Sequence, residues 1–308
     1  MASGQFLRNP ERNLEPLHRR LAEFNRLRLV PELDAADWQQ QLRQETELRI
    51  VEGHFIEAER ARVRAVAQSA PTQPREFVVW FESLKELAAQ ENQRLLNWLA
   101  TSANRGDLSW FLVQELAGAG ALEDLLALTQ VRLPRRARLE LARDYWDEMG
   151  HGHASAMRCQ LLEDLLHDLH ADATESPIWE TLARDNLMLG LATNRRYAYQ
   201  SVGALAAVDL FGAERAASVS AGLARLGFSD NAGDYFAVRA KMCVLRSHGW
   251  LQGAILPLVA EDARRASALA EGALLRLAAD TRCLRCCERE LVPFHLAPRA
   301  AATSASPR

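Results

Sequence analysis

The sequence has no run of the roughly 18 to 20 apolar residues that a membrane-spanning helix requires. Its first stretch, MASGQFLRNPERNLEPLHRR, contains no apolar core of the kind found in a signal peptide. The formal net charge is only -3 and is spread along the chain, so no basic domain for nucleic acid is present. We therefore expect a cytoplasmic protein that has neither a membrane nor a nucleic acid as its partner.

Cysteine is scarce, with five residues in 308, and an odd number does not suit a disulfide framework. In a cytoplasmic chain these thiols are expected to be reduced. Three of them cluster as Cys283, Cys286 and Cys287, and only His295 lies nearby as a further metal ligand. A structural zinc site usually needs two such cysteine pairs. Structural cysteines are the favoured interpretation, and a metal or redox role is the alternative.

Strand signals are nearly absent, because runs with period-two alternation and many β-branched residues hardly occur. Apolar residues instead recur at steps of three and four, which is typical of amphipathic helices. These helical stretches cover residues 14–27, 35–64, 74–101, 108–116, 121–129, 135–149, 155–169 and 263–278. The sequence predicts an all-α protein, and 308 residues suffice for a full core.

No long linker of low complexity divides the chain, although several Gly, Pro and Asn clusters break the helical pattern. We expect an N-terminal helical extension over residues 1–104, packed on the outside of one helical bundle over residues 105–297. Residues 298–308, rich in Ala, Ser, Thr and Pro, are expected to form a disordered tail. Asp107 is expected to be the N-cap of the helix that follows it.

Three groups of motifs lie in the second half of the chain. The first, DLSWFLVQE, ends at Glu115, and the second, DYWDEMGHGH, contains Glu148. The third begins with GALAAVD, which ends at Asp209, and continues with GLARLG, YF, WL and PLV over 222–259. In order and spacing these motifs resemble the haem-oxygenase-like diiron oxidases, or iron-containing redox enzymes, over about residues 105 to 260. The resemblance implies a haem-oxygenase-like helical bundle.

The resemblance also implies a site in which carboxylates and imidazoles project into the bundle to hold two irons. Glu115 and Glu148 stand at the first two glutamate positions of the family. Asp209 stands at a later glutamate position with a shorter side chain. These three carboxylates are the part of the implied site that the chain retains.

Arginine stands at every histidine position of the family pattern. The histidine expected about ten residues after Glu148 falls on Arg158, and the HxxxDxxH trio falls on Arg239, Cys243 and Arg246. A guanidinium group stays protonated near neutral pH and offers no lone pair to a metal. We therefore expect no metal cofactor.

The three arginines and the three retained carboxylates form a charge-balanced set. Buried carboxylates without a metal would repel one another, and guanidinium groups at the vacated positions would pair with them. The set predicts a salt-bridged polar core in place of a metal centre. The alternative is that some of these arginines face solvent, as most helical arginines do.

Two nearby histidines offer a fallback metal site. His151 lies three residues after Glu148, a spacing that places both on one face of a helix, and His153 follows. The glycines around His151 instead indicate a helix end. If iron is bound, the fallback ligands are Glu115, Glu148, His151, His153 and Asp209.

The leading interpretation is a divergent family member that lacks a standard diiron site. It would act as a metal-independent enzyme or a ligand-binding accessory protein in specialised metabolism, on a small-molecule or carrier-bound anionic substrate. The candidate substrate-binding residues are Arg158, Asp209, Tyr235, Arg239 and Arg246. The candidate catalytic residues are Glu115, Glu148 and Cys243.

Cys243 has two interpretations. Flanking arginines would favour its thiolate and make it a nucleophile, whereas a buried thiol would behave as a small apolar residue. The second function class is a non-haem iron oxidase with altered ligands, acting on an amino-acid or fatty-acid-like substrate. A purely structural or partner-binding helical protein is the third, so enzymatic activity stays open. The resemblance also implies that the chain can form a homodimer.

Overall fold

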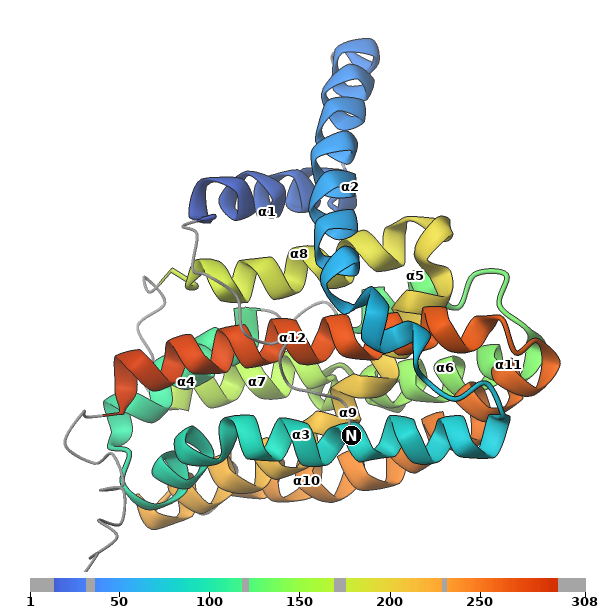
Figure 1. The fold of residues 1–308 in the computed structure, drawn as a ribbon. Coiled ribbons are helices and arrows are strands. Elements are labelled where there is room, and N and C mark those ends of the chain that lie inside the picture. Colours follow the sequence, from blue (N-terminus) through green and yellow to red (C-terminus); the bar gives the residue numbers. More distant parts are fainter. Residues whose placement is uncertain (1–13, 32–36, 118–121, 169–175, 229–231, 293–308) are drawn as a thin grey trace, which may run out of the picture.

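The structure is a computed structural model that describes residues 14–31, 37–117, 122–168, 176–228 and 232–292. The described residues form helices and no strand, which confirms the predicted all-α class (Figure 1). The elements are α1 (Glu15–Leu29), α2 (Trp38–Gln68), α3 (Pro74–Thr101), α4 (Arg105–Ala117), α5 (Leu122–Thr129), α6 (Arg135–Glu148), η2 (Gly150–Gly152), η3 (Ala154–Ala156), α7 (Arg158–Asp168), α8 (Trp179–Thr193), η4 (Arg195–Tyr197), α9 (Ala198–Arg225), α10 (Ala232–Gly249), η5 (Trp250–Ile255), α11 (Leu256–Glu261) and α12 (Arg265–Leu291). The predicted tail at 298–308 and His295 lie outside the described residues.

Helix α9 is the centre of the bundle and packs against α3, α10 and α12. Two glycines allow its close contact with α12. A Cβ atom on Gly203 would clash with the carbonyl oxygen of Leu269, and one on Gly272 would clash with that of Gln200. Because glycine has no Cβ, the two backbones can touch here. The charged side chains of α9 and α12 are therefore brought together inside the bundle.

Helix α3 belongs to the same core as the bundle, although it lies in the expected N-terminal extension. Phe77, Phe81, Leu95 and Leu99 on this helix are fully buried, and α3 packs along both α9 and α12. The boundary expected at residue 104 therefore does not coincide with an edge of the core. Burying four large apolar side chains contributes about 1.5 to 3 kcal/mol each before entropy is counted.

Helix α4 begins three residues earlier than predicted. The side chain of Asn104 accepts a hydrogen bond from the Asp107 N–H (3.0 Å), and Asp107 Oδ2 accepts one from the Asn104 N–H (2.9 Å). This reciprocal pair satisfies two backbone donors at the helix start. Asn104 is thus the cap, and the prediction that Asp107 holds that position is wrong.

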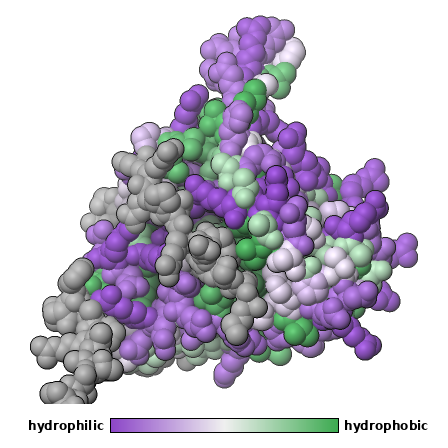
Figure 2. All heavy atoms as spheres, in the orientation of Figure 1, coloured by the Kyte–Doolittle hydropathy of each residue, from purple (hydrophilic) through white to green (hydrophobic). Residues whose placement is uncertain are grey.

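The first part of α2 projects beyond the other helices (Figure 1). Trp38, Leu42 and Ile50 are exposed there, and Figure 2 shows this end as mostly hydrophilic with a few hydrophobic residues. Helix α1 packs on α8 beside the base of α2. Among the described helices, none combines the length and the apolar character needed to cross a bilayer.

Candidate functional site

The turn after Glu148 determines where the first arginine of the site lies. Helix α6 ends at Glu148, and then Gly150, His151 and Gly152 all have positive φ, at 58°, 53° and 86°. A Cβ atom on Gly150 would clash with the backbone of the returning chain, so glycine is required at this reversal. The reversal brings Arg158, the first residue of α7, to 3.5 Å from Glu148 (Nη1 to Oε2).

Glu148 lies at the centre of a cluster of three arginines, and its side chain is only 1% exposed. Arg239 Nη1 is 3.4 Å from Glu148 Oε1, and Arg246 Nη1 donates a hydrogen bond to the same oxygen. Arg239 and Arg246 lie seven residues apart on α10, so they share one helical face. The prediction that Arg158, Arg239 and Arg246 point inward and pair with retained carboxylates is confirmed for Glu148.

The charges in this cluster stabilise one another. Burial by itself would raise the pKa of Glu148, but the positive charges of Arg158, Arg239 and Arg246 outweigh burial and lower it to about 2. The pKa of Arg239 is raised, because Asp209 and Glu148 outweigh the effect of burial. Glu148 therefore remains a carboxylate across the physiological range, held by permanent cations.

Asp144 connects the cluster to the π-helical turn η5. Trp250 Nε1 donates a hydrogen bond to Asp144 Oδ2 (2.5 Å), and Arg246 Nε lies 3.8 Å from Asp144 Oδ1. Burial and the negative charge of Asp209 raise the pKa of Asp144 to about 7, although Arg246 lowers it. Asp144 is therefore a buried group that exchanges its proton near neutral pH.

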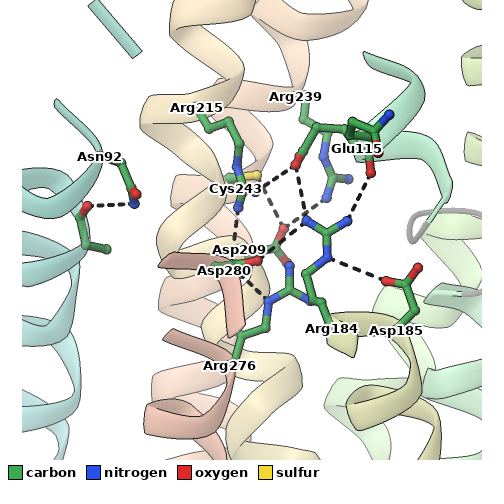
Figure 3. Close-up of polar contacts among 12 residues, drawn as sticks. Asn92, Glu115, Arg184, Asp185, Asp209, Arg215, Arg239, Cys243, Arg276 and Asp280 are labelled. Carbon is green, nitrogen blue, oxygen red and sulfur yellow. Dashed lines mark hydrogen bonds and ion pairs between the residues drawn. The ribbon is translucent and has the colours of Figure 1, made fainter. Parts of the chain in front are cut away.

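Cys243 faces Asp209 inside the bundle. Its thiol donates to Asp209 Oδ1 at 3.3 Å, and Arg239 Nη2 lies 3.5 Å from the same oxygen (Figure 3). Burial and the charge of Asp209 raise the pKa of Cys243 to about 12, although Arg239 lowers it. Of the two interpretations of Cys243, these contacts favour the buried, protonated thiol over the thiolate, since Arg239 is already paired with Asp209.

Glu115 lies in a second cluster. Its Oε1 accepts hydrogen bonds from Arg184 Nη1 (3.2 Å) and Arg215 Nη1 (3.0 Å) (Figure 3). The prediction that Glu115 belongs to one set with Arg158, Arg239 and Arg246 is therefore wrong. Glu115 pairs with two other arginines, Arg184 and Arg215. The reason is that α4 presents Glu115 toward α8 and α9, which carry Arg184 and Arg215.

Asp280 on α12 completes this second cluster and is contacted by three guanidinium groups. Arg276 Nε lies 2.9 Å and Arg215 Nη2 3.4 Å from its Oδ2, and Arg184 Nη1 lies 3.7 Å from its Oδ1. Burial would raise the pKa of Asp280, but these arginines lower it to about 2. Arg184 Nε also lies 3.5 Å from Asp185. Arg184, Arg215, Arg276 and Asp280 were not singled out from the sequence. The signal that could have identified them is a charged residue on the apolar face of a helix.

A cavity of about 150 Å³ lies between the two clusters, and a groove of about 530 Å³ lies beside the Glu148 cluster. Arg158, Tyr235 and Arg239 line both. The Tyr235 hydroxyl is buried and has no hydrogen-bond partner among the described residues. Of the substrate-binding candidates, Arg246 lines the groove but not the cavity. Asp209 belongs to the lining of neither space and pairs with Arg239.

The fallback metal ligands are not brought together. His151 is 63% exposed and lies 3.4 Å from Asp147, His153 is exposed, and Glu115 belongs to the second cluster. Where the chain is described, no group of three or more His, Cys, Asp or Glu side chains could hold a metal ion.

The cysteine cluster on α12 lies inside the bundle. Cys283, Cys286 and Cys287 are buried, and all five cysteines of the chain are free thiols. Cys283 Sγ lies 3.3 Å from the hydroxyl of Thr181 on α8. These contacts are those of structural cysteines packed between helices.

A family model described as iron-containing redox enzyme, of the haem-oxygenase type, matches residues 109–281. This match covers more than half of the 308 residues. The chain therefore belongs to the haem-oxygenase-like family of iron-containing redox enzymes, and the resemblance noted in the sequence is confirmed. No curated protein matches the chain.

Proposed function

We propose that this chain is a family member that works without iron and binds a small anionic ligand, free or carrier-bound, inside the bundle. The observation that carries the proposal is the binding of Glu148 by three arginines, each at a position where the family pattern has a histidine. An imidazole can ligate a metal there, whereas a guanidinium group competes with the metal for the carboxylate.

The donor set does not fit a diiron centre. Both Glu148 and Asp209 are already within 3.5 Å of Arg239. A divalent ion about 4 Å from one guanidinium group would be repelled by about 8 kcal/mol at an effective dielectric constant near 20. The anionic part of the proposal is supported by the guanidinium groups of Arg158 and Arg239, which line the cavity between the two clusters and can bind a carboxylate or phosphate through paired donors.

Ferrous iron added without oxygen tests the iron-free function. We expect much less than one iron per chain after desalting, and no oxygen-dependent change in absorption when air is admitted. The matched variant replaces Arg158, Arg239 and Arg246 with His and carries Cys243→Asp, and its iron content should rise. Tight binding of about two irons by the unmodified protein, as in a diiron site, would overturn the proposal and restore the oxidase interpretation.

A further inference from the structure

The cavity between the two clusters has an uneven distribution of charge. It is lined by five arginines, Arg158, Arg184, Arg215, Arg239 and Arg276. Among the residues that the structure describes, only two carboxylates line it, Glu115 and Asp185. The carboxylates that balance the other guanidinium groups, Glu148, Asp209 and Asp280, do not belong to its lining. A ligand that enters the cavity therefore meets mainly positive charge.

Arg276 lies where this positive charge is least balanced. Burial and the charges of Arg184 and Arg215 lower the pKa of Arg276, although Asp280 raises it. The pKa of Arg215, by contrast, is raised by Glu115 and Asp280 in spite of burial. An anion beside Arg276 would therefore offset part of the repulsion among these three guanidinium groups, which share one carboxylate, Asp280.

Two donors on other residues that line the cavity have no partner among the described residues. They are the hydroxyl of Tyr235 and the Nε of Arg158, and both atoms are buried. A buried donor without an acceptor is destabilising. Both side chains line the cavity, although the two donor atoms themselves do not reach its surface. The cavity thus offers cationic donors on two sides, one from the Asp280 cluster and one from the Glu148 cluster.

The size and the remaining lining limit the body of the ligand. The volume of about 150 Å³ is that of a cavity that holds a molecule of about benzene size. Leu162, Met188 and Val208 contribute apolar surface to the same lining. A short hydrocarbon body fits this surface better than a sugar or a nucleotide, whose hydroxyl groups would lose their hydrogen bonds to water.

We infer that the cavity binds a short dicarboxylate, with one carboxylate beside Arg215 and Arg276 and the other beside Arg158, Arg239 and Tyr235. The inference rests on the proposed ligand-binding function and names its ligand class. A guanidinium group binds a carboxylate through two parallel N–H donors, and the two sides each supply more than one such group. A ligand with only one anionic end would meet the guanidinium groups of only one of the two clusters.

Calorimetric titration of the iron-free protein tests the ligand class. Succinate is the probe, monomethyl succinate is the matched monoanion, and inorganic phosphate tests for a compact dianion. We expect succinate to bind at least about tenfold more tightly than either. Equal affinity for succinate and its monoester, tighter binding of phosphate, or no heat with millimolar succinate would each overturn the inference.

A pair of substitutions tests the location. Val208 lines the cavity, and Val238, which is 58% exposed, lines only the groove. Val208→Phe should fill the cavity and weaken succinate binding by more than about tenfold, whereas Val238→Phe should leave it unchanged. The reverse result would place the ligand in the groove and overturn the assignment.

A second pair of variants covers the case in which Val208→Phe does not fold. Arg276→Lys keeps the charge in the cavity but removes the planar donor pair, and should weaken binding by about tenfold. Arg282→Lys, on the same helix but paired with Glu59, is the control and should not weaken it. Equal affinities in the two variants would refute the role of Arg276.

The two proposals fail separately in these measurements. Iron uptake would overturn the iron-free function, yet Glu148 does not line the cavity, so the succinate titration is still interpretable. If the protein takes up no iron and does not bind succinate, only the dicarboxylate assignment is overturned.

Discussion

Replacing Arg246 with alanine is the sharpest test of the Glu148 cluster. The Arg246 side chain is 11% exposed and contacts Glu148 and two aspartates, with Asp147 Oδ2 at 3.6 Å and Asp144 Oδ1 at 3.8 Å. Alanine removes all three contacts. Glu148 retains its ion pairs with Arg158 and Arg239, so its carboxylate loses one of three partners and stays paired.

The magnitude follows from these contacts. At 3.6 to 3.8 Å and an effective dielectric constant near 20, one pair of unit charges attracts by about 4 kcal/mol. The desolvation of the buried guanidinium group offsets part of that attraction, and the alanine variant no longer has this desolvation cost. Breaking a buried ion pair typically costs about 3 to 5 kcal/mol. Because two arginines remain on Glu148, we expect the free energy of unfolding to fall by about 3 kcal/mol.

Urea unfolding of the wild type and the variant measures this change, and Arg49→Ala is the matched control. Arg49 also pairs with a glutamate, Glu45, at 2.6 Å, but it is 52% exposed. Exposed helical pairs contribute about 0.3 to 0.5 kcal/mol, so this variant should stay close to wild type. A loss for Arg246→Ala as small as that for Arg49→Ala would refute the reasoning, since it would mean that Arg246 is solvated.

Two further predictions follow from the pKa values of buried groups. The pKa of Cys243 is raised to about 12 by burial and by Asp209, so iodoacetamide near pH 8 should alkylate this thiol only after unfolding; rapid labelling of Cys243 in the folded protein, mapped by mass spectrometry, would contradict this. The pKa of Asp144 is raised to about 7, so the folded protein retains a proton that the unfolded chain releases near its ordinary pKa of about 4. Stability should therefore fall as the pH rises from about 4 to 7 and level off above that. The variant Asp144→Asn should flatten this slope in urea midpoints measured at several pH values, and an unchanged slope would refute the assignment.

The sequence by itself determined the fold class and much of the Glu148 cluster. Steps of three and four fix which side chains share a helical face, so Arg239 and Arg246 were placed on one face, and the resemblance to the family implied that this face points inward. The tight reversal that brings back Arg158 follows from local chemistry as well, because Gly150 and Gly152 adopt positive φ at low cost. Local spacing therefore placed the two arginines on one face and Arg158 after a tight turn, whereas the resemblance to the family supplied their pairing with Glu148, which lies 91 and 98 residues before Arg239 and Arg246.

Only the tertiary structure decided the partners of Glu115 and the state of Cys243. Glu115 is held by Arg184 and Arg215, which lie 69 and 100 residues further along the chain. The thiol of Cys243 stays protonated because Asp209, on another helix, accepts its hydrogen bond and pairs with the nearest arginine. Helical periodicity says which face a residue occupies, but the packing of one helix on another sets which charges meet. Coulomb energies vary with those distances, so they were fixed only when the bundle formed.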